Sequence, residues 1–431
     1  MRPGRPLSVA VLVDLEWRAD SGGQVKCWDR LAEAAVGLGG QVDLTVHFSC
    51  PPGEGPPPVR VLGDNVRYRF HPPRFSTRRL PFLSAMPDHA DLGRFHRGLA
   101  AHLAGADVVH TTDAYFTFAR TAGRWCRERA IPLTTSIHTD TPAYAGLYTA
   151  SLVERLSAAL PPARWLLRGA RLAERVEAGF ERALRDHLRA CAMVLVSRPQ
   201  DRERALGCVA ADRVGFLRRG VDRDLFTPEK RDRAWLGRAF AVPGDAFLVL
   251  FVGRVDRGKN ALPLARAVHR LAAAGRPVHL FCAGAGDDRA AIAGLLGGGA
   301  TCPGHLDQAT LARVYACADL LAAPSAVETL GNVVLEAAAA GLPAVVNGRS
   351  GMGRVVTAGE DGLVVDGSDP SDWAAALDRA MADRGALAAM GRTARRRAEA
   401  RLPTWRLVVE EDLLPAWDRA AGGRGAGRRA A

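Results

Sequence analysis

The sequence predicts an α/β protein made of two doubly wound domains. Short, continuous apolar runs alternate with stretches of helical periodicity along nearly all of its 431 residues. Strands that are apolar on both faces are typical of parallel sheets covered by helices on both sides. The length suits two domains of ordinary size, and 48% hydrophobic with 24% charged residues indicates a globular protein with a sizeable core.

Eight apolar runs are the expected strands: 9–13, 107–110, 133–137, 193–196, 247–252, 278–283, 320–323 and 344–346. The first set ends near residue 218, where Leu217-Arg-Arg-Gly-Val-Asp222 precedes a linker. We therefore predict a first Rossmann-like domain over 1–218 and a second over 219–402. An apolar-faced helix over 403–420 is expected to pack back towards the first domain, and 421–431 is expected to be a disordered tail.

Composition narrows the functional class. The formal net charge of +12 suits an anionic partner such as nucleotide phosphates, an anionic membrane surface or nucleic acid. The eight cysteines form no CxxC pair and no zinc-type spacing, as expected for reduced thiols in a cytoplasmic protein. The apolar run 7–13 ends at Asp14, too soon for a secretory signal or a membrane span. We expect a cytoplasmic protein whose membrane contact, on the inner face, is at most peripheral.

Glycine-rich and basic turns follow two expected strands. Gly22 and Gly23 open a helical pattern after strand 9–13, where backbone N–H groups can face an anion, although most such glycines only turn the chain. After strand 247–252 come Gly253, Arg254 and Lys259, at the sheet edge where open α/β sheets bind ligands. A guanidinium fork beside a lysine suits a diphosphate, and the alternative is a solvated basic loop.

Two carboxylates, Glu328 and Glu336, flank a glycine-opened helix start that also contains Thr329, Leu330, Gly331 and Asn332. An ionised carboxylate in an apolar segment needs hydrogen-bonding partners, and sugar hydroxyls would serve. The N–H groups after Gly331 would lie at the positive end of a helix dipole. The alternatives are an N-cap role for Glu328 and an arginine pair for Glu336.

Two other motifs are weaker. Gly284-Ala-Gly286 follows a strand, but Arg289 occupies the third glycine position of a dinucleotide fingerprint, which argues against a nicotinamide site. Asp222-Arg-Asp224 has the spacing of a metal-binding DxD motif but follows no clear strand end, so we interpret it as linker structure.

Polar residues also follow two strands of the first domain. His110 and Asp113 come at the end of one strand, and His138 and Asp140 at the end of the next. Polar groups at the carboxyl ends of parallel strands favour a cleft, although a lone histidine is usually structural.

The motifs together resemble the retaining, nucleotide-sugar-dependent glycosyltransferases of family 4 (group 1 glycosyltransferases). The family has the GT-B fold, in which two Rossmann-like domains face each other across a cleft. The matching positions span nearly the whole chain: Gly22-Gly23, His138, 218–222 with Phe226, Gly253-Arg254 with Lys259, and the EX7E element from Glu328 to Glu336. In motif style the chain is nearest to the branch of sulfoquinovosyl- and mannosyl-lipid synthases.

The resemblance implies a role for each matching residue, and it implies that no metal or other cofactor is needed. Arg254 and Lys259 would hold the donor diphosphate, Glu328 the transferred sugar and Glu336 the ribose. The Gly331 helix start would face phosphate, Gly22 and Gly23 would border the donor pocket, and His138 would face the reacting centre. His110, Asp113 and Asp140 are the acceptor-side candidates. The implied reaction transfers a hexose from a UDP- or GDP-sugar to a lipid or glycan hydroxyl with retention.

Several alternatives stay open. Two basic segments with interleaved apolar residues, 65–87 and 168–189, could rest on an anionic membrane surface or pack on the domain. A nucleotide-sugar epimerase or phosphorylase would share the fold. A nucleic-acid-binding protein is suggested only by the charge, and because no recognition module is present, we expect no nucleic-acid partner.

Overall fold

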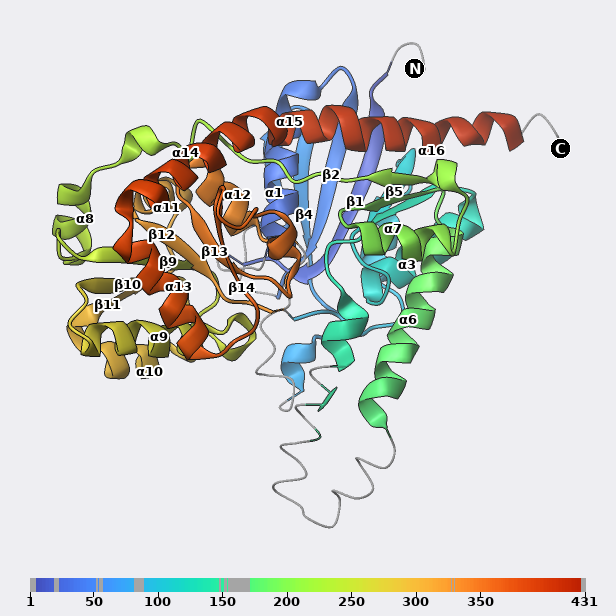
Figure 1. Cartoon of the computed structure of the whole chain (residues 1–431). Helices are drawn as coiled ribbons and strands as arrows, with labels where there is room; N and C mark the ends of the chain where they lie inside the picture. The colour runs from blue at the N-terminus through green and yellow to red at the C-terminus, as the bar shows by residue number, and fades with distance from the viewer. Residues whose placement is uncertain are drawn as a thin grey trace. The chain divides into compact units, whose positions relative to one another are not determined.

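The structure is a computed structural model, and it describes residues 5–18, 23–51, 53, 57–80, 89–146, 149–150, 153, 171–326, 328 and 330–427 (Figure 1). The chain divides into two compact units, residues 1–218 with 405–431 (unit 1) and residues 219–404 (unit 2). Each unit has its own largely parallel sheet with helices around it, which confirms the predicted α/β class.

Unit 1 is built on an eight-stranded sheet in the order β3-β4-β2-β1-β5-β6-β7-β8, parallel throughout except for β3 against β4. Its strands are β1 (Leu7–Glu16), β2 (Val42–Ser49), β3 (Val59–Gly63), β4 (Val66–His71), β5 (Val108–Thr111), β6 (Leu133–Ser136), β7 (Met193–Val196) and β8 (Val214–Phe216). Its α-helices include α1 (Gly23–Ala35), α2 (Arg97–His102), α3 (Thr117–Arg129), α6 (Leu172–Ala190), α7 (Pro199–Leu206), α15 (Trp405–Val408) and α16 (Leu414–Gly427).

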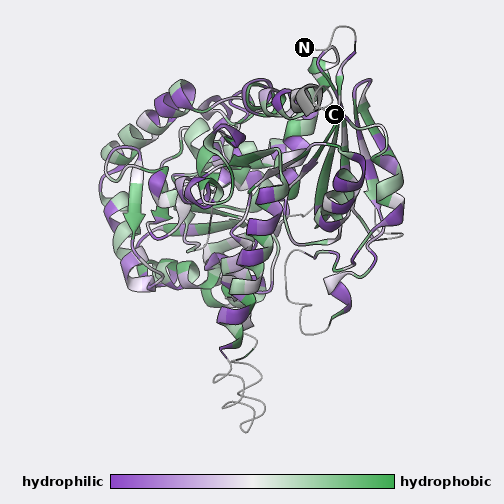
Figure 2. Cartoon of the chain, turned by 90° about the vertical axis from the view of Figure 1, so that its right-hand side faces the viewer, coloured by the Kyte–Doolittle hydropathy of each residue, from purple (hydrophilic) through white to green (hydrophobic). Residues whose placement is uncertain are grey.

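The strand β1 is apolar at successive positions because the sheet is covered on both faces. Val9, Val11 and Val13 face one core cluster, and Ala10 and Leu12 face the other. Successive side chains of a strand point to opposite faces, so a strand buried on both sides needs an unbroken apolar run. The strands are accordingly coloured mainly green, for hydrophobic residues, in Figure 2.

The last helices belong to unit 1. The π-helical turn η9 (Val409–Leu413) lies between α15 and α16, and there Asp412 accepts hydrogen bonds from the backbone N (2.8 Å) and Nη2 (2.7 Å) of Arg218. Hydrogen bonding of the Arg218 side chain to Asp412 raises the pKa of Arg218. Farther along, Trp417 is fully buried in the core. The helix α16 is described as far as Gly427, and residues 428–431 lie outside the described residues. The expectation of a disordered tail over 421–431 stays a prediction.

Unit 2 is built on a six-stranded parallel sheet in the order β11-β10-β9-β12-β13-β14. Its strands are β9 (Phe247–Val252), β10 (Val278–Ala283), β11 (Ala300–Gly304), β12 (Leu320–Ala323), β13 (Ala344–Asn347) and β14 (Gly362–Val365). Its α-helices are α8 (Arg233–Phe240), α9 (Ala261–Ala273), α10 (Arg289–Leu296), α11 (Gln308–Cys317), α12 (Asn332–Ala339), α13 (Pro370–Ala382) and α14 (Arg384–Arg401). The strand order reverses between β9 and β12, and doubly wound sheets bind ligands at the carboxyl side of such a switch point.

Within the part of the chain that is described, no helix combines the length and the apolar character needed to cross a bilayer. The basic helix α6 buries Leu184 and Leu188, so part of its apolar face packs inside unit 1.

Candidate functional site

The predicted phosphate-binding cations of unit 2 lie just after β9, on the turn that contains the 3-10 helix η6 (Arg257–Lys259). Asp256 organises this turn with both carboxylate oxygens. Oδ2 accepts from Arg254 Nε at 3.0 Å, and Oδ1 accepts from the Lys259 backbone N at 3.0 Å. One carboxylate therefore orients the guanidinium of Arg254 and caps the turn that presents Lys259. Gly253 permits the chain reversal, since its φ of +138° is unfavourable for other residues.

Glu328 comes from the neighbouring strand end, after β12. Its carboxylate contacts the Lys259 ammonium, and both side chains remain about a quarter exposed, at 25% and 24%. Its backbone carbonyl accepts from Gly351 N at 2.8 Å, which anchors the 351–354 turn beside the site. The two predicted residues are thus brought together at the switch point.

Gly331 starts α12 in a backbone conformation that favours glycine, with φ +71°. A Cβ atom there would lie 2.6 Å from Met352, whose side chain is buried beneath it. Asn332 is the first residue of α12, and Leu330 precedes Gly331 at the same edge. The N-terminal N–H groups of α12 therefore begin beside Glu328, where they could face an anion.

Glu336 lies one turn into α12, and its Oε2 accepts a hydrogen bond of 2.9 Å from the hydroxyl of Tyr315 on α11. Tyr315 is completely buried, and this burial together with the Glu336 charge raises the pKa of its hydroxyl. The tyrosine consequently stays protonated and acts as a donor. Sequence reasoning missed Tyr315, because nothing in a helical apolar pattern distinguishes it from an ordinary core tyrosine.

Gly284 and Gly286 have a structural role in unit 2. A Cβ on Gly284 would lie 1.8 Å from the carbonyl oxygen of Gly253, and one on Gly286 would lie 2.3 Å from that of Val255. Both glycines allow the loop after β10 to pack directly on the turn that carries Arg254. The presence of these two glycines is therefore explained by close packing next to the site, and no nicotinamide cofactor is needed to account for them. The Asp222 carboxylate likewise accepts from Asp224 N and Leu225 N, as a turn cap does.

The two histidines predicted for unit 1 lie inside its core, 0% and 4% exposed for His110 and His138. The indole N–H of Trp417 points to His110 Nδ1 (3.3 Å), and His110 Nε2 lies 2.9 Å from Ser136 Oγ. Ser136 Oγ lies 2.7 Å from His138 Nε2, which also accepts from Trp28 Nε1 at 3.1 Å. Indoles only donate, so these contacts assign the neutral tautomers: the ring proton lies on Nε2 in His110 and on Nδ1 in His138.

His110 is therefore placed as a core residue, and the structure does not support it as an acceptor-contacting group. Both of its ring nitrogens contact protein atoms, since Nδ1 also lies 2.8 Å from Thr134 Oγ1. Burial lowers its pKa to about 3. A lone histidine on a buried strand is more often structural than catalytic, and that alternative holds for His110.

Asp113 is half-buried and closes the turn before α3, accepting from Tyr115 N at 2.9 Å and Phe116 N at 3.2 Å. Burial raises its pKa against the effect of these bonds. Asp14, at the end of β1, accepts from Phe118 N at 2.6 Å and is fully buried, and burial together with the Asp113 charge raises its pKa. Two adjacent strand ends thus carry carboxyl groups at the edge expected for function.

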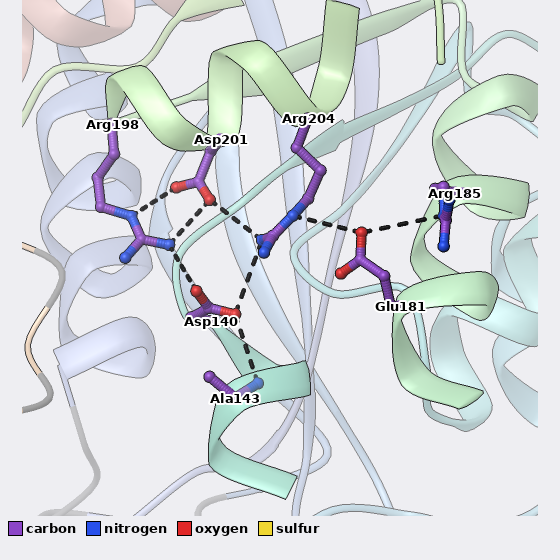
Figure 3. A network of polar contacts seen from close by, with 7 residues as sticks. All are labelled: Asp140, Ala143, Glu181, Arg185, Arg198, Asp201 and Arg204. Atoms are coloured by element: carbon purple, nitrogen blue, oxygen red, sulfur yellow. Dashed lines mark hydrogen bonds and ion pairs between the residues drawn. The ribbon is translucent and has the colours of Figure 1, made fainter. Parts of the chain in front are cut away.

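Asp140 takes part in an ion-pair network with α7 and α6 (Figure 3). Its carboxylate lies 3.3 Å from Arg198 Nη2 and 3.6 Å from Arg204 Nη1. Both arginines also contact the buried Asp201, and Arg204 reaches Glu181 at 3.4 Å. The geometry explains Asp140 as the anchor of the 140–143 turn, and a ligand would have to share it with two guanidinium groups.

Gly22 and Thr329 lie outside the described residues, and Gly23 is the first residue of α1. Of the described residues, no three or more His, Cys, Asp or Glu side chains are grouped so as to hold a metal ion. The expectation that no metal is needed stays a prediction.

Comparison with known proteins identifies the family. The model of "Glycosyltransferase Family 4" matches residues 21–225, and that of "Glycosyl transferases group 1" matches residues 246–383. D-inositol 3-phosphate glycosyltransferase 1 of Catenulispora acidiphila is 32% identical over 370 residues, which cover 82% of this chain and 80% of that protein. The chain belongs to the family 4, group 1 glycosyltransferases. Other curated D-inositol 3-phosphate glycosyltransferases match over 43% to 52% of their own length.

Solved structures agree on the fold. Sucrose-phosphate synthase from Thermosynechococcus elongatus has a TM-score of 0.64 at 21% identity, over 98% of both chains. Anabaena HepE in complex with UDP-glucose has a TM-score of 0.63 at 14% identity, over 97% of this chain and 100% of that one. The predicted GT-B fold is thereby confirmed, and membership of family 4 confirms the predicted enzyme class, a glycosyltransferase. The narrower likeness to sulfoquinovosyl- and mannosyl-lipid synthases stays a prediction.

Proposed function

We propose that this family 4 glycosyltransferase moves a hexose from a UDP- or GDP-sugar to an acceptor hydroxyl with retention of anomeric configuration. The observation that carries the proposal is the contact between Lys259 and Glu328 at the switch point of the unit 2 sheet, where Asp256 holds Arg254 on the same turn as Lys259. Glu336 lies one turn into α12, the helix that begins after Glu328. These residues offer two cations for a diphosphate and two carboxylates for hydroxyls. That HepE binds UDP and UDP-glucose supports a uridine donor among the candidates.

In the proposed reaction the bond between the sugar C1 and the diphosphate oxygen breaks, and a bond from C1 to the acceptor oxygen forms on the same face. The acceptor proton passes to the departing diphosphate, so no protein base is required. Arg254 and Lys259 stabilise the charge that develops on the diphosphate, which is the kind of interaction that contributes most to such barriers. Glu328 holds the transferred sugar and Glu336 holds the ribose, and a role for His138 beside the reacting sugar stays a prediction.

For the acceptor, the sequence favours a lipid or glycan, whereas the relatives' name specifies inositol 3-phosphate. Lipids, glycans and inositol 3-phosphate all offer a hydroxyl group, and we propose that the acceptor belongs to one of these classes. A panel of myo-inositol, inositol 3-phosphate, a phosphatidylinositol and a short glycan separates them by product mass. Turnover of the donor without any acceptor would instead favour an epimerase or a hydrolytic side activity.

The donor site is tested with three proteins: wild type, Lys259→Ala and Arg257→Gln. Arg257 is an exposed cation of the same turn whose side chain forms no hydrogen bond or ion pair among the described residues, so it controls for the loss of charge. We expect Lys259→Ala to lower kcat by about 100-fold or more, the effect of removing one transition-state charge contact. Arg257→Gln should change kcat by less than about threefold. Equal losses in both variants would exclude the assigned role of Lys259.

Retention is tested separately by proton NMR of the first product formed from an α-linked donor. An α-linked product supports the proposal, and a β-linked product contradicts it.

A further inference from the structure

A cavity of about 610 Å³ in unit 1 is lined by Arg74, Phe95, Arg97 and Arg124. Among the described residues, the four that line it include three arginines from three different segments: the loop after β4, the start of α2 and the middle of α3. None of these four described residues is acidic. Like charges around one cavity repel each other; Glu128 offsets part of the Arg124 charge, and an anion in the cavity would lower the remaining cost.

The backbone that carries Arg74 is held firmly. Asp91 is completely buried, and its carboxylate accepts from the backbone N of Arg74 (2.7 Å), Phe75 (2.8 Å) and Gly93 (2.9 Å). A Cβ on Gly93 would lie 2.9 Å from the Cβ of Arg74, so the two segments are in close contact. Asp91 therefore positions Arg74 by binding main-chain N–H groups and supplies no counter-charge to its guanidinium in the described contacts.

Arg124 is positioned by two neighbours. Its Nε donates to Glu128 Oε1 at 2.8 Å, and its guanidinium carbon lies 5.1 Å from the centre of the Phe95 ring. Stacking on an aromatic ring keeps the guanidinium plane in place and leaves the terminal Nη groups available to a ligand. The planar fork of arginine matches the oxygens of a phosphate.

The cavity is separate from the strand ends of unit 1 that carry the acceptor-side candidates. Arg124 is seven residues after Thr117, the first residue of α3, which corresponds to about 10 Å along the helix. Asp113 lies just before that end of the helix. A phosphate bound by Arg124 would therefore lie away from the strand ends that carry Asp113 and Asp140.

We infer that the Arg74, Arg97 and Arg124 cavity is a second anion site, which binds a phosphate monoester or diester through guanidinium forks. The phosphate could belong to a small phosphorylated molecule or to a phospholipid headgroup, and the experiment distinguishes these sources. The inference does not depend on the proposed donor site.

The test compares two double variants in a Lys259→Ala background, which removes the proposed donor site as a competing phosphate binder. Arg97→Gln/Arg124→Gln alters the cavity. Arg94→Gln/Arg127→Gln is the matched control, since these arginines are also exposed, lie on the same segments and do not line the cavity. Both pairs remove two positive charges. Binding is measured at a fixed ionic strength with glycerol 3-phosphate, by calorimetry, and with phosphatidylglycerol vesicles, by sedimentation against phosphatidylcholine vesicles.

We expect the cavity variant to lose about tenfold or more in affinity for at least one probe, while the control stays within about threefold of its parent. Loss for glycerol 3-phosphate identifies a small phosphate ligand, and loss for vesicles alone identifies a lipid headgroup. Equal losses in the two variants would mean that only general charge attraction is involved, and absence of binding to the parent protein would also overturn the inference. Circular dichroism at 222 nm verifies that each variant is folded.

Discussion

The hydroxyl of Tyr315 donates a 2.9 Å hydrogen bond to Glu336, so a fully buried tyrosine orients the carboxylate that we assign to the donor ribose. Tyr315→Phe removes only this bond and keeps the ring. Hydrogen bonds to charged groups contribute about 1.5–3 kcal/mol, and part of that orientation should be lost. We expect the donor Kd to rise about threefold to tenfold with little change in kcat, measured by calorimetry and steady-state kinetics. A fall in kcat alone would contradict this positioning role.

Asp256 should have two separable roles: its charge orients Arg254, and its side-chain oxygen caps the turn that presents Lys259. Asp256→Asn keeps an oxygen that can accept from Lys259 N but removes the ionic partner of Arg254. Asp256→Ala removes both. We expect kcat/KM to fall about tenfold in the first variant and further in the second, since a lost N-cap costs about 1 kcal/mol in addition. Indistinguishable variants would show that the charge alone matters and that the cap contributes nothing.

Burial of His110 in its neutral form should make the stability of unit 1 decrease at acid pH. The pKa of His110 is about 3 in the folded protein and near 6.5 when unfolded, so the unfolded chain binds the extra proton as the pH falls below 6.5. The contribution of His110 to stability is therefore complete above pH 6.5 and is lost as the pH falls towards 3. One such proton corresponds to about 1.4 kcal/mol per pH unit.

His110→Gln removes this titration while keeping a polar side chain. Between pH 5.5 and 4, the free energy of unfolding should fall less steeply in the variant than in the wild type, by about 1.4 kcal/mol per pH unit. Urea unfolding followed by tryptophan fluorescence measures it, because Trp28 and Trp417 both lie beside His110. Asp14 titrates in the opposite sense, but it does so in both proteins, so its effect cancels when the two pH profiles are subtracted. Parallel pH profiles would contradict the prediction.

Gly284 should be sensitive to the smallest substitution. Gly284→Ala places a methyl group 1.8 Å from a backbone oxygen, at a φ of +154°, so the turn that carries Arg254 has to move. We expect a loss of about 2 kcal/mol or more in stability, together with weaker donor binding. Gly294→Ala is the control, because that glycine lies in α10 with free space around its Cβ, and alanine favours a helix by up to about 1 kcal/mol.

The sequence was sufficient for eight of the fourteen described strands, because those eight are short, continuous apolar runs. The strands β2, β3, β4, β8, β11 and β14 were not predicted. Apolar runs buried on both faces identify parallel strands, and residues at the ends of β9 and β12 must come close once the sheet order is that of a doubly wound fold. Arg254, Lys259 and Glu328 were predicted to lie near one another in this way; Lys259 does contact Glu328, and the functional roles of all three stay predictions. Asp256 could have been found too, since an aspartate three residues before Lys259 has N-cap spacing.

The unit 1 residues were harder to interpret because long-range partners decide their roles. His110 follows the rule for a strand-end functional group, yet it contacts Trp417, 307 residues later in the chain. Asp140 also follows the rule, yet its neighbours are arginines on α7. Periodicity predicts which side chains are buried, but it does not say which polar groups meet inside the core.

The position of Trp417 in the core of unit 1 has a consequence for biosynthesis. During synthesis, residues 1–218 emerge from the ribosome first and residues 219–404 next. The second unit can therefore complete its core while the first still lacks α15 and α16. The unit translated first is therefore the last to become fully folded. Until α16 emerges, unit 1 exposes the apolar surface that Val408, Leu413 and Trp417 later cover. We expect chaperones to bind the nascent chain at this surface.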